Sequence, residues 1–186
     1  MAARTGRHVL LIGLPGSGKS TVAPELAGML GVEWTDLDEA VVARAGLSVP
    51  ELFEQFGEQH FRDLELAEFR NALDGPPRVL AAGGGLLGSE RARSLAADCE
   101  VVWLRARLDT LLARLGPDER AARPLLGARG AGPGEQSLRA GLARLEERRA
   151  DTYSETADVV VEVDGRSPRE VAGIVLDGLT GAEGAH

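Results

Sequence analysis

A glycine-rich segment near the start of the chain contains residue types that can hold a row of phosphate groups. Residues 13–20 read Gly-Leu-Pro-Gly-Ser-Gly-Lys-Ser and fit the pattern G-x-x-x-x-G-K-[ST] in full. Glycines let backbone N–H groups approach an anion closely, and the dipole of a following helix favours negative charge. We expect Lys19 to lie between the β- and γ-phosphates of ATP and Ser20 to ligate Mg²⁺. The predicted ATP contacts in this segment are Gly13, Gly16, Ser17, Gly18, Lys19, Ser20 and Thr21.

The neighbours of this segment match the structural context that the pattern requires. Residues 8–12, His-Val-Leu-Leu-Ile, indicate a buried strand, and residues 19–30 indicate a helix that stops at Gly31. A chance glycine-rich turn is the first alternative, and it is disfavoured because motif and context agree. A loop that binds a nucleotide without transferring its phosphate stays open as a second alternative.

The position of the acidic residues narrows the class of nucleotide-binding protein. Many phosphate-loop NTPases carry an Asp at the end of another long apolar strand. Here the strand predicted at 78–82 runs into three glycines, and the strand predicted at 101–104 runs into an arginine. The available carboxylates are Asp36 and Asp38, which follow the strand predicted at 32–35. This arrangement disfavours motor ATPases and GTPases and favours a small kinase.

Asp36 and Asp38 share one face of the second strand if that strand continues through them. Two carboxylates beside a phosphate site repel each other unless a cation such as Mg²⁺ lies between them. We expect Asp36 and Ser20 on the metal side, with Asp36 acting through a water molecule. Asp38 is predicted to orient the acceptor hydroxyl and to accept its proton. The alternative is that Asp38 is an ordinary helix N-cap.

Arg62 continues an apolar stripe, because Leu66, Phe69 and Leu73 follow it at helical spacing. A guanidinium that faces inward needs an anion. Glu65 can hold one side of it, and a bound carboxylate can take the other side. The alternative is that Arg62 reaches water at the helix start or simply pairs with Glu65.

Two further features point to a ligand site. Gly83, Gly84 and Gly85 follow a strand at the sheet edge where ligands of open α/β sheets bind, so their N–H groups can meet a ligand closely. A flexible turn is the alternative. Phe53 and Phe61 are candidates to line a site for a ring-shaped substrate, although packing in the core is the alternative that the sequence alone favours.

The irregular segment 116–134 is rich in Gly, Pro and Arg and indicates a lid. Arg120 and Arg123 lie in it. An Arg on a closing loop can reach the transferred phosphate and help to exclude water. A solvated surface loop is the alternative.

Strands and helices alternate along the whole chain, which predicts an α/β fold: a five-stranded parallel sheet with helices on both faces. We expect a single domain over residues 1–186. The predicted strands are 8–12, 32–35, 78–82, 101–104 and 159–163. The predicted helices are 19–30, one that begins near 48, 58–73, 108–115, 135–151 and one that begins near 168 and ends near 178.

Composition excludes several classes of protein. The formal net charge of −8 disfavours nucleic acid as a partner, and apolar runs of about five residues are far below the ~20 that span a bilayer. Cys99 is the only cysteine, and residues 1–7 do not begin a secretory signal, which fits a reducing cytoplasm. We expect a cytoplasmic monomer that binds neither nucleic acid nor membrane.

The motifs, taken in order, resemble the shikimate kinase family. They are Gly-Leu-Pro-Gly-Ser-Gly-Lys-Ser-Thr at 13–21, Asp-Leu-Asp at 36–38, Gly-Glu-Gln-His-Phe-Arg-Asp-Leu-Glu at 57–65, Gly-Gly-Gly at 83–85, Arg-Pro-Leu-Leu at 123–126, and Arg149 four residues before Tyr153. The first motif is shared by many families, whereas the whole set in this order is far more specific. The resemblance runs from about residue 8 to residue 168.

This resemblance implies a nucleoside-monophosphate-kinase-like fold with a core, a lid at about 116–134 and a substrate-binding region at about 38–75. It implies ATP-dependent phosphorylation of shikimate to shikimate 3-phosphate, with Mg²⁺. By this likeness Lys19 and Arg123 stabilise the γ-phosphate, and Arg114 and Pro168 hold adenine. The implied catalytic residues are Lys19, Asp38 and Arg123. By this likeness the substrate contacts are Asp38, Arg62, Gly84, Gly85 and Arg149. The residue patterns described above add Phe53, Phe61, Glu65 and Gly83 as candidates.

The sequence also leaves competing functions open. Another small kinase with this loop, such as a gluconate kinase or a nucleotide kinase, is the nearest enzyme. A carboxylate grip by Arg62 and Arg149 favours shikimate, because a nucleotide acceptor would need groups that read a base. A regulatory module that only binds nucleotide is disfavoured by the intact Lys19, Ser20 and Asp38.

Overall fold

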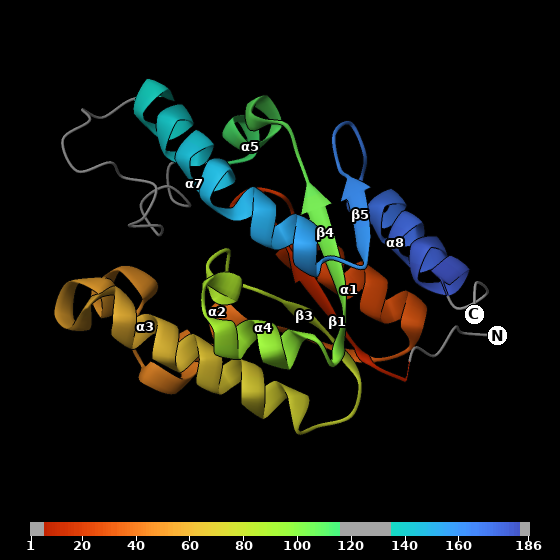
Figure 1. The fold of residues 1–186 in the computed structure, drawn as a ribbon, viewed down its shortest axis with the longest axis horizontal. Helices are drawn as coiled ribbons and strands as arrows, with labels where there is room; N and C mark the ends of the chain where they lie inside the picture. Colours follow the sequence, from red (N-terminus) through yellow and green to blue (C-terminus); the bar gives the residue numbers. More distant parts are fainter. Residues whose placement is uncertain (1–5, 116–134, 183–186) are drawn as a thin grey trace.

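The computed structural model describes residues 6–115 and 135–182. Its centre is a five-stranded sheet in which every strand pair is parallel, with the order β2-β3-β1-β4-β5 (Figure 1). The strands are β1 His8–Ile12, β2 Glu33–Asp36, β3 Arg78–Ala81, β4 Cys99–Arg105 and β5 Val159–Glu162. The predicted α/β class and the five parallel strands are therefore confirmed.

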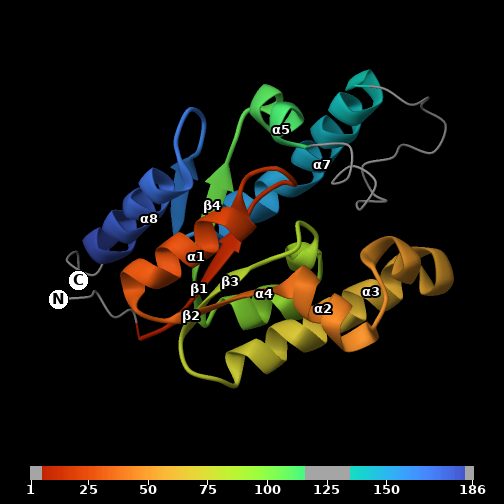
Figure 2. The ribbon, with the colours of Figure 1, turned by 180° about the vertical axis from the view of Figure 1, so that it is seen from behind.

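The side chains of β1 alternate between two apolar layers, as period-two strand geometry requires. Val9 and Leu11 pack into the larger layer, which contains residues of α1 and α8. Leu10 and Ile12 pack into the second layer, which contains residues of α3, α4 and α7. The two views show the same arrangement, with α1 and α8 on one face and α3, α4 and α7 on the other (Figures 1 and 2). The sheet is thus covered on both faces, as predicted.

The helices begin and end close to the sequence-based predictions where a cap marks the end. Gly31 ends α1 in a left-handed conformation, and Ser48 with Glu51 forms a complete capping box at the start of α3. Helix α7 extends five residues beyond the predicted end at 151, and α8 extends four beyond 178. The helices are α1 Lys19–Leu30, α2 Leu37–Ala45, α3 Val49–Leu73, α4 Glu90–Ala96, α5 Leu108–Arg114, α7 Glu135–Thr156 and α8 Pro168–Ala182, with a short 3₁₀ turn at Leu86–Gly88.

The structure corrects the expectation that the second strand continues through both acidic residues. β2 stops at Asp36, whose side chain caps α2 by accepting hydrogen bonds from the N–H groups of Asp38 and Glu39. The N-cap is therefore Asp36 rather than Asp38. Asp38 lies in the first turn of the helix, so the two carboxylates do not share a strand face. This turn moves Asp38 away from the metal side and toward α3.

Helix α3 contains one break. Gly57 has φ 82° and ψ 172°, a non-helical conformation that divides the segment before Glu58 from the long helix that follows. The two helices predicted at 48 and 58–73 are therefore both present, joined at a kink. The glycine makes this turn accessible because it has no Cβ.

The carboxyl ends of all five parallel strands meet at one edge of the sheet, where ligands of open α/β sheets bind. The loop after β1, the start of α2 and the glycine run after β3 all lie at this edge. In the described ranges, none of the helices combines the length and the apolar character needed to cross a membrane.

Candidate active site

The phosphate-binding loop joins β1 to α1, and its backbone depends on glycine. Gly13, Gly16 and Gly18 have φ angles of 152°, 83° and 94°. A Cβ at Gly13 would lie 2.5 Å from the carbonyl oxygen of Leu104, so a larger residue would collide with β4. Gly18 is also the N-cap of α1, so the loop brings the positive end of that helix dipole to the ligand edge of the sheet.

The Lys19 side chain is buried against this loop. Its Nζ donates to the carbonyl oxygens of Gly13 at 2.9 Å and Leu14 at 3.1 Å, and lies 3.4 Å from Ser17 Oγ. Only 8% of Lys19 is exposed. The ammonium is fixed beside the loop amides, which places a positive charge within the predicted phosphate site.

Ser20 and Asp36, the two predicted metal residues, are brought together. Ser20 Oγ donates to Asp36 Oδ2, while Asp36 Oδ1 accepts the helix-cap bond from Asp38 N at 2.9 Å. Hydroxyl and carboxylate oxygens suit Mg²⁺, which keeps several waters and phosphate oxygens as its other ligands. Within the described part of the chain, no group of three or more His, Cys, Asp or Glu is placed to hold a metal.

Two carboxylates meet over the first glycine of the 83–85 run. Asp38 comes from the first turn of α2, and Glu65 comes from α3, where it is fully buried. A Cβ at Gly83 would lie 2.6 Å from Asp38 Oδ1 and closer still to Glu65 Oε1. Glu65 Oε2 accepts a 2.6 Å hydrogen bond from Arg62, whereas its Oε1 is buried without a hydrogen-bond partner among the described residues. Glycine at 83 is what lets both carboxylates reach this point.

Two guanidinium groups lie against the next two glycines. A Cβ at Gly84 would lie 2.5 Å from Arg149 Nη1, and a Cβ at Gly85 would lie 2.5 Å from Arg62 Cζ. Arg62 does face inward, and its guanidinium also lies over the ring of Phe61, 5.2 Å from the ring centre. The glycine run therefore lets these two guanidinium groups, as well as a bound ligand, come close to the backbone.

Burial dominates the electrostatics of this cluster. It raises the pKa of Glu65 to about 7, an effect that the Arg62 guanidinium partly opposes and that the Asp38 carboxylate reinforces. Burial also lowers the pKa of Arg149, with neighbouring Arg62 acting in the same direction. An arginine stays cationic at neutral pH even so. Two cations thus lie in a site whose net charge depends on the proton of Glu65.

A cavity of about 400 Å³ lies beside these groups, between α3, the 3₁₀ turn and α7. Arg62, Glu65, Gly85 and Arg149 are part of its wall. Phe53 and Phe61 are not among the residues that line this cavity. Their ring centres lie 5.0 Å apart in a small apolar cluster between α2 and α3, which is the packing alternative that the sequence left open; Phe61 is buried in that cluster together with Val41 and Leu52.

Arg114, predicted to hold adenine, lies beside the phosphate loop. Its guanidinium donates to the carbonyl oxygens of Ser17 at 3.4 Å and Val163 at 3.2 Å, joining the loop to the end of β5. Pro168 is the first residue of α8 and follows Ser167, which forms a capping box with Glu170. The structure therefore places Arg114 between the phosphate loop and the turn that leads to Pro168.

The family model for shikimate kinase matches residues 15–180, and this range contains almost all of the site described above. The chain belongs to the shikimate kinase family. The predicted resemblance is confirmed, and so is the class of enzyme.

Individual members of the shikimate kinase family are similar over nearly the whole length. A shikimate kinase from Paramagnetospirillum magneticum is 39% identical over 181 residues, covering 96% of this chain and 87% of that protein. One from Geobacter sulfurreducens is 40% identical over 167 residues, covering 89% and 87%. The structure of an Acinetobacter baumannii shikimate kinase in complex with shikimate has a TM-score of 0.88 at 28% identity, covering 97% of this chain and 96% of that one.

Some of the residues to which a role was assigned from the sequence lie outside the described ranges. Arg120, Arg123 and the whole predicted lid at 116–134 fall in this category. The roles assigned to Arg123 therefore stay predictions.

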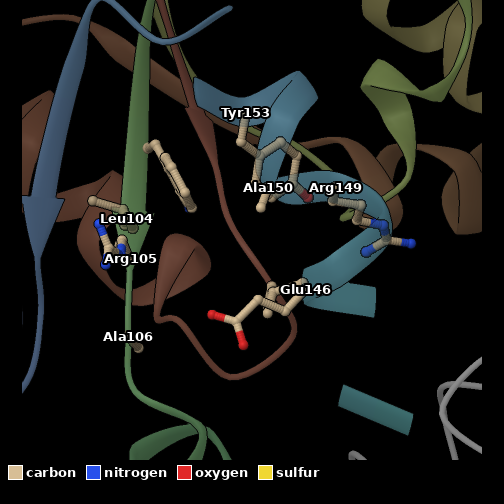
Figure 3. A pocket seen from close by; sticks show the side chains of 9 residues that line it. Leu104, Arg105, Ala106, Glu146, Arg149, Ala150 and Tyr153 are labelled. Atoms are coloured by element: carbon tan, nitrogen blue, oxygen red, sulfur yellow. The ribbon is translucent and has the colours of Figure 1, made fainter. Parts of the chain in front are cut away.

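Two residues with defined places at the site have no role assigned from the sequence, although Tyr153 belongs to the motif set. Tyr153 projects from α7 near Arg149 beside the carboxyl end of β4, where Figure 3 shows them lining a small pocket. Its hydroxyl donates to the carbonyl oxygen of Gly84 at 2.7 Å. Asp164, after β5, accepts hydrogen bonds from Arg107 N and Thr110 Oγ1 and so anchors the start of α5. No local pattern marks either contact, because the partners lie 54 to 69 residues apart in the sequence.

Proposed function

We propose that this chain transfers the γ-phosphate of ATP to the 3-hydroxyl of shikimate, with the site residues named above in defined roles. The observation that carries the proposal is the arrangement on the glycine run. Three consecutive glycines support a carboxylate pair and two guanidinium groups, next to a phosphate-binding loop. A hydroxylated ring acid offers the complementary groups, one carboxylate and several hydroxyls.

The two arginines are proposed to grip the substrate carboxylate. Arg62 is held on one side by Glu65 through the 2.6 Å hydrogen bond, and on the rest of its planar fork only a long 3.5 Å contact with the exposed Glu58 competes with a second anion. Arg149 faces the neighbouring glycine from the opposite helix. Gripping the ring from α3 and α7 fixes its rotation, and this positioning is a large part of phosphoryl-transfer catalysis.

Asp38 is proposed to orient the acceptor hydroxyl and to accept its proton. The turn at the start of α2 places its carboxylate over Gly83, between the metal side at Asp36 and the arginine grip. The hydroxyl oxygen then attacks the γ-phosphorus in line, the bond to the β-phosphate oxygen breaks, and ADP leaves. The proton passes to Asp38 as the new P–O bond forms.

The phosphate side is proposed to neutralise the charge that the transfer redistributes. Lys19 and the loop amides bind the β- and γ-phosphates at the N-terminus of α1. We assign Ser20 and Asp36 to hold Mg²⁺, which would supply positive charge to offset that of the phosphates. Asp36 also caps α2, so one side chain ties the metal side to the helix that carries Asp38.

We also propose the organisation and surroundings inferred from the sequence. Residues 38–75 form the substrate-binding region of a single domain, which agrees with the positions of Asp38, Arg62 and Glu65. The net charge of −8 and the single cysteine support a cytoplasmic enzyme without a nucleic-acid partner. We expect a monomer, which light scattering on the purified chain would test.

Parallel turnover assays test the substrate. ADP release would be coupled to a spectroscopic signal and measured with shikimate, gluconate and nucleoside monophosphates under the same conditions. We expect turnover with shikimate alone. Asp38→Asn should lose about 100-fold or more in kcat while still binding ATP. Turnover with gluconate or a nucleotide in place of shikimate would refute the substrate assignment, and nucleotide binding without any transfer would refute the catalytic one.

A further inference from the structure

Tyr153 is a core residue with one polar atom placed at the site. It lies in the last turns of α7 with only 3% exposed, and its ring meets the edge of Trp103 at a centre-to-centre distance of 5.6 Å. Both residues belong to the apolar layer beneath the glycine run. The packing therefore fixes the ring, and the ring fixes the direction of the hydroxyl.

The hydroxyl completes a set of bonds to the carbonyl groups of the glycine run. The Gly83 oxygen accepts from Leu86 N at 3.2 Å, and the Gly85 oxygen accepts from Gly88 N at 3.0 Å, so the 3₁₀ turn uses these two. The Gly84 oxygen instead accepts from Tyr153 at 2.7 Å. All three carbonyls are thus satisfied, and the plane of each peptide is held.

Holding the Gly84 carbonyl also sets the direction of the next amide. The Gly84–Gly85 peptide is planar and trans, so its N–H points opposite to its C=O. Because the C=O points to Tyr153 in the core, the Gly85 N–H points away from the core. Gly85 lines the 400 Å³ cavity, and its N–H donates to no described residue.

The protonation of Tyr153 suits this role. Burial raises the pKa of its phenol, and Arg149, through its charge and a hydrogen bond to the phenol, opposes that effect only in part. The phenol therefore stays neutral across the physiological range and keeps the proton that it donates. Other groups that face it are Arg62 and Glu65, which act in opposite directions on its pKa.

We propose that Tyr153 is a positioning residue for substrate binding: its hydroxyl fixes the Gly84–Gly85 peptide so that the Gly85 N–H donates to an oxygen of the substrate. This rests on the proposed function, in which the same glycines bind the acidic ring compound. Tyr153 itself touches no substrate. It acts through the backbone, and without its hydroxyl the peptide can turn and withdraw the donor.

The first test is the Tyr153→Phe variant, which keeps the ring and removes the hydroxyl. We expect the KM for shikimate to rise about tenfold, because a buried carbonyl loses its donor and the adjacent N–H loses its fixed direction. The KM for ATP and kcat should stay within about twofold. A matched control is Val101→Ala, which loosens the same apolar layer near the other end of β4 and should leave both KM values unchanged.

A second measurement does not depend on a substitution. Tyr153 is the only tyrosine in the chain, so incorporation of 3-fluorotyrosine labels this position alone. The ¹⁹F resonance should shift when shikimate is added and should titrate with the same half-saturation as the binding measured by calorimetry. Gluconate should cause no shift.

The outcomes separate this inference from the proposed function. Absence of turnover by the wild-type chain with shikimate would refute the proposed function itself. If the wild-type chain turns over shikimate normally and the shikimate KM of Tyr153→Phe stays within twofold of wild type, only the role of Tyr153 is overturned. A comparable KM rise in Val101→Ala, or a ¹⁹F resonance that shikimate does not move, would overturn it as well.

Discussion

The carboxyl oxygens of Asp38 and Glu65 converge on the same point above the α-carbon of Gly83. One comes from the first turn of α2 and the other from α3, and the point where they meet lies where a Cβ would stand. Asp38 is the proposed base, and Glu65 holds Arg62. The proposed base and the arginine that is to bind the substrate carboxylate therefore both depend on the absence of a Cβ at Gly83.

Gly83→Ala should displace at least one of the two carboxylates that meet at this position. The new methyl group would collide with both buried carboxyl oxygens, so Asp38 or Glu65 must move. A displacement of about 1 Å at a reacting group costs on the order of 100-fold in rate, and we expect a loss of that size in kcat/KM for shikimate with ATP binding retained. Coupled ADP release and ATP titration measure the two quantities.

Gly88→Ala is the matched control for this variant. It lies in the same segment, and a Cβ there would have nothing within 4 Å. We expect activity within twofold of wild type. Equal losses in both variants would mean that the segment needs glycine for flexibility alone, and the steric account of Gly83 would then be wrong.

The raised pKa of Glu65 predicts that stability falls as pH rises toward neutrality. An unfolded Glu titrates near 4.3, whereas folding raises the pKa of Glu65 to about 7. Between these values the folded state binds the extra proton, so the free energy of unfolding decreases with rising pH and levels off above about pH 7. The contribution is fully present below about pH 4 and is lost as pH rises through 7.

Glu65→Gln removes this titration. Urea unfolding of wild type and variant at pH 5, 6, 7 and 8 should show wild type losing stability relative to the variant, on the order of 2 kcal/mol over that range. Glu54→Gln, at an exposed position in the same α3 segment, should run parallel to wild type. If the Glu65→Gln curve also stays parallel to wild type, Glu65 does not hold a proton in the folded state.

The residues of the phosphate loop could be predicted because their conformation is set locally. A strand, a glycine pattern and a helix follow each other within 30 residues, and the structure reproduces β1 and α1 at the predicted bounds. The capping box at Ser48 and the end of α1 at Gly31 are equally local. These elements are predictable because their hydrogen bonds close within a few residues.

The three features that the sequence does not predict have different physical reasons. Asp36 and Asp38 were expected on one strand face, but Asp36 can cap a helix, and that bond ends the strand. Helix α4 is only seven residues long and has no sustained period, so it was not predicted. The contact of Tyr153 with Gly84 joins segments 69 residues apart, which only the folded sheet brings together.

Asp36→Asn separates the capping role of Asp36 from its proposed metal role. Asn is as good an N-cap as Asp, so the thermal midpoint should change little. The loss of charge should raise the Mg²⁺ concentration for half-maximal activity about tenfold, as for other groups that support a bound metal through water. Activity titrated with Mg²⁺ at saturating ATP and shikimate measures this. An unchanged half-saturation would remove Asp36 from the metal site.

Asp164 is predicted to support ATP binding by anchoring α5. Its carboxylate accepts from Arg107 N at 3.1 Å and from the Thr110 hydroxyl, both at the start of α5, while Arg114 at the end of that helix reaches the phosphate loop. Asp164→Ala removes a cap worth about 1 kcal/mol, so α5 should fray and the KM for ATP should rise about fivefold.

Two further variants make the Asp164 prediction specific to the anchor. Asp164→Asn keeps an oxygen acceptor and should restore most of the ATP affinity, whereas Glu162→Ala, two residues earlier at an exposed site, should have no effect. The shikimate KM should stay constant in all three, because α5 does not contribute to the wall of the substrate cavity. A rise in both KM values together would indicate that Asp164 supports the fold as a whole and not the nucleotide side, which would contradict its assignment as an anchor for Arg114.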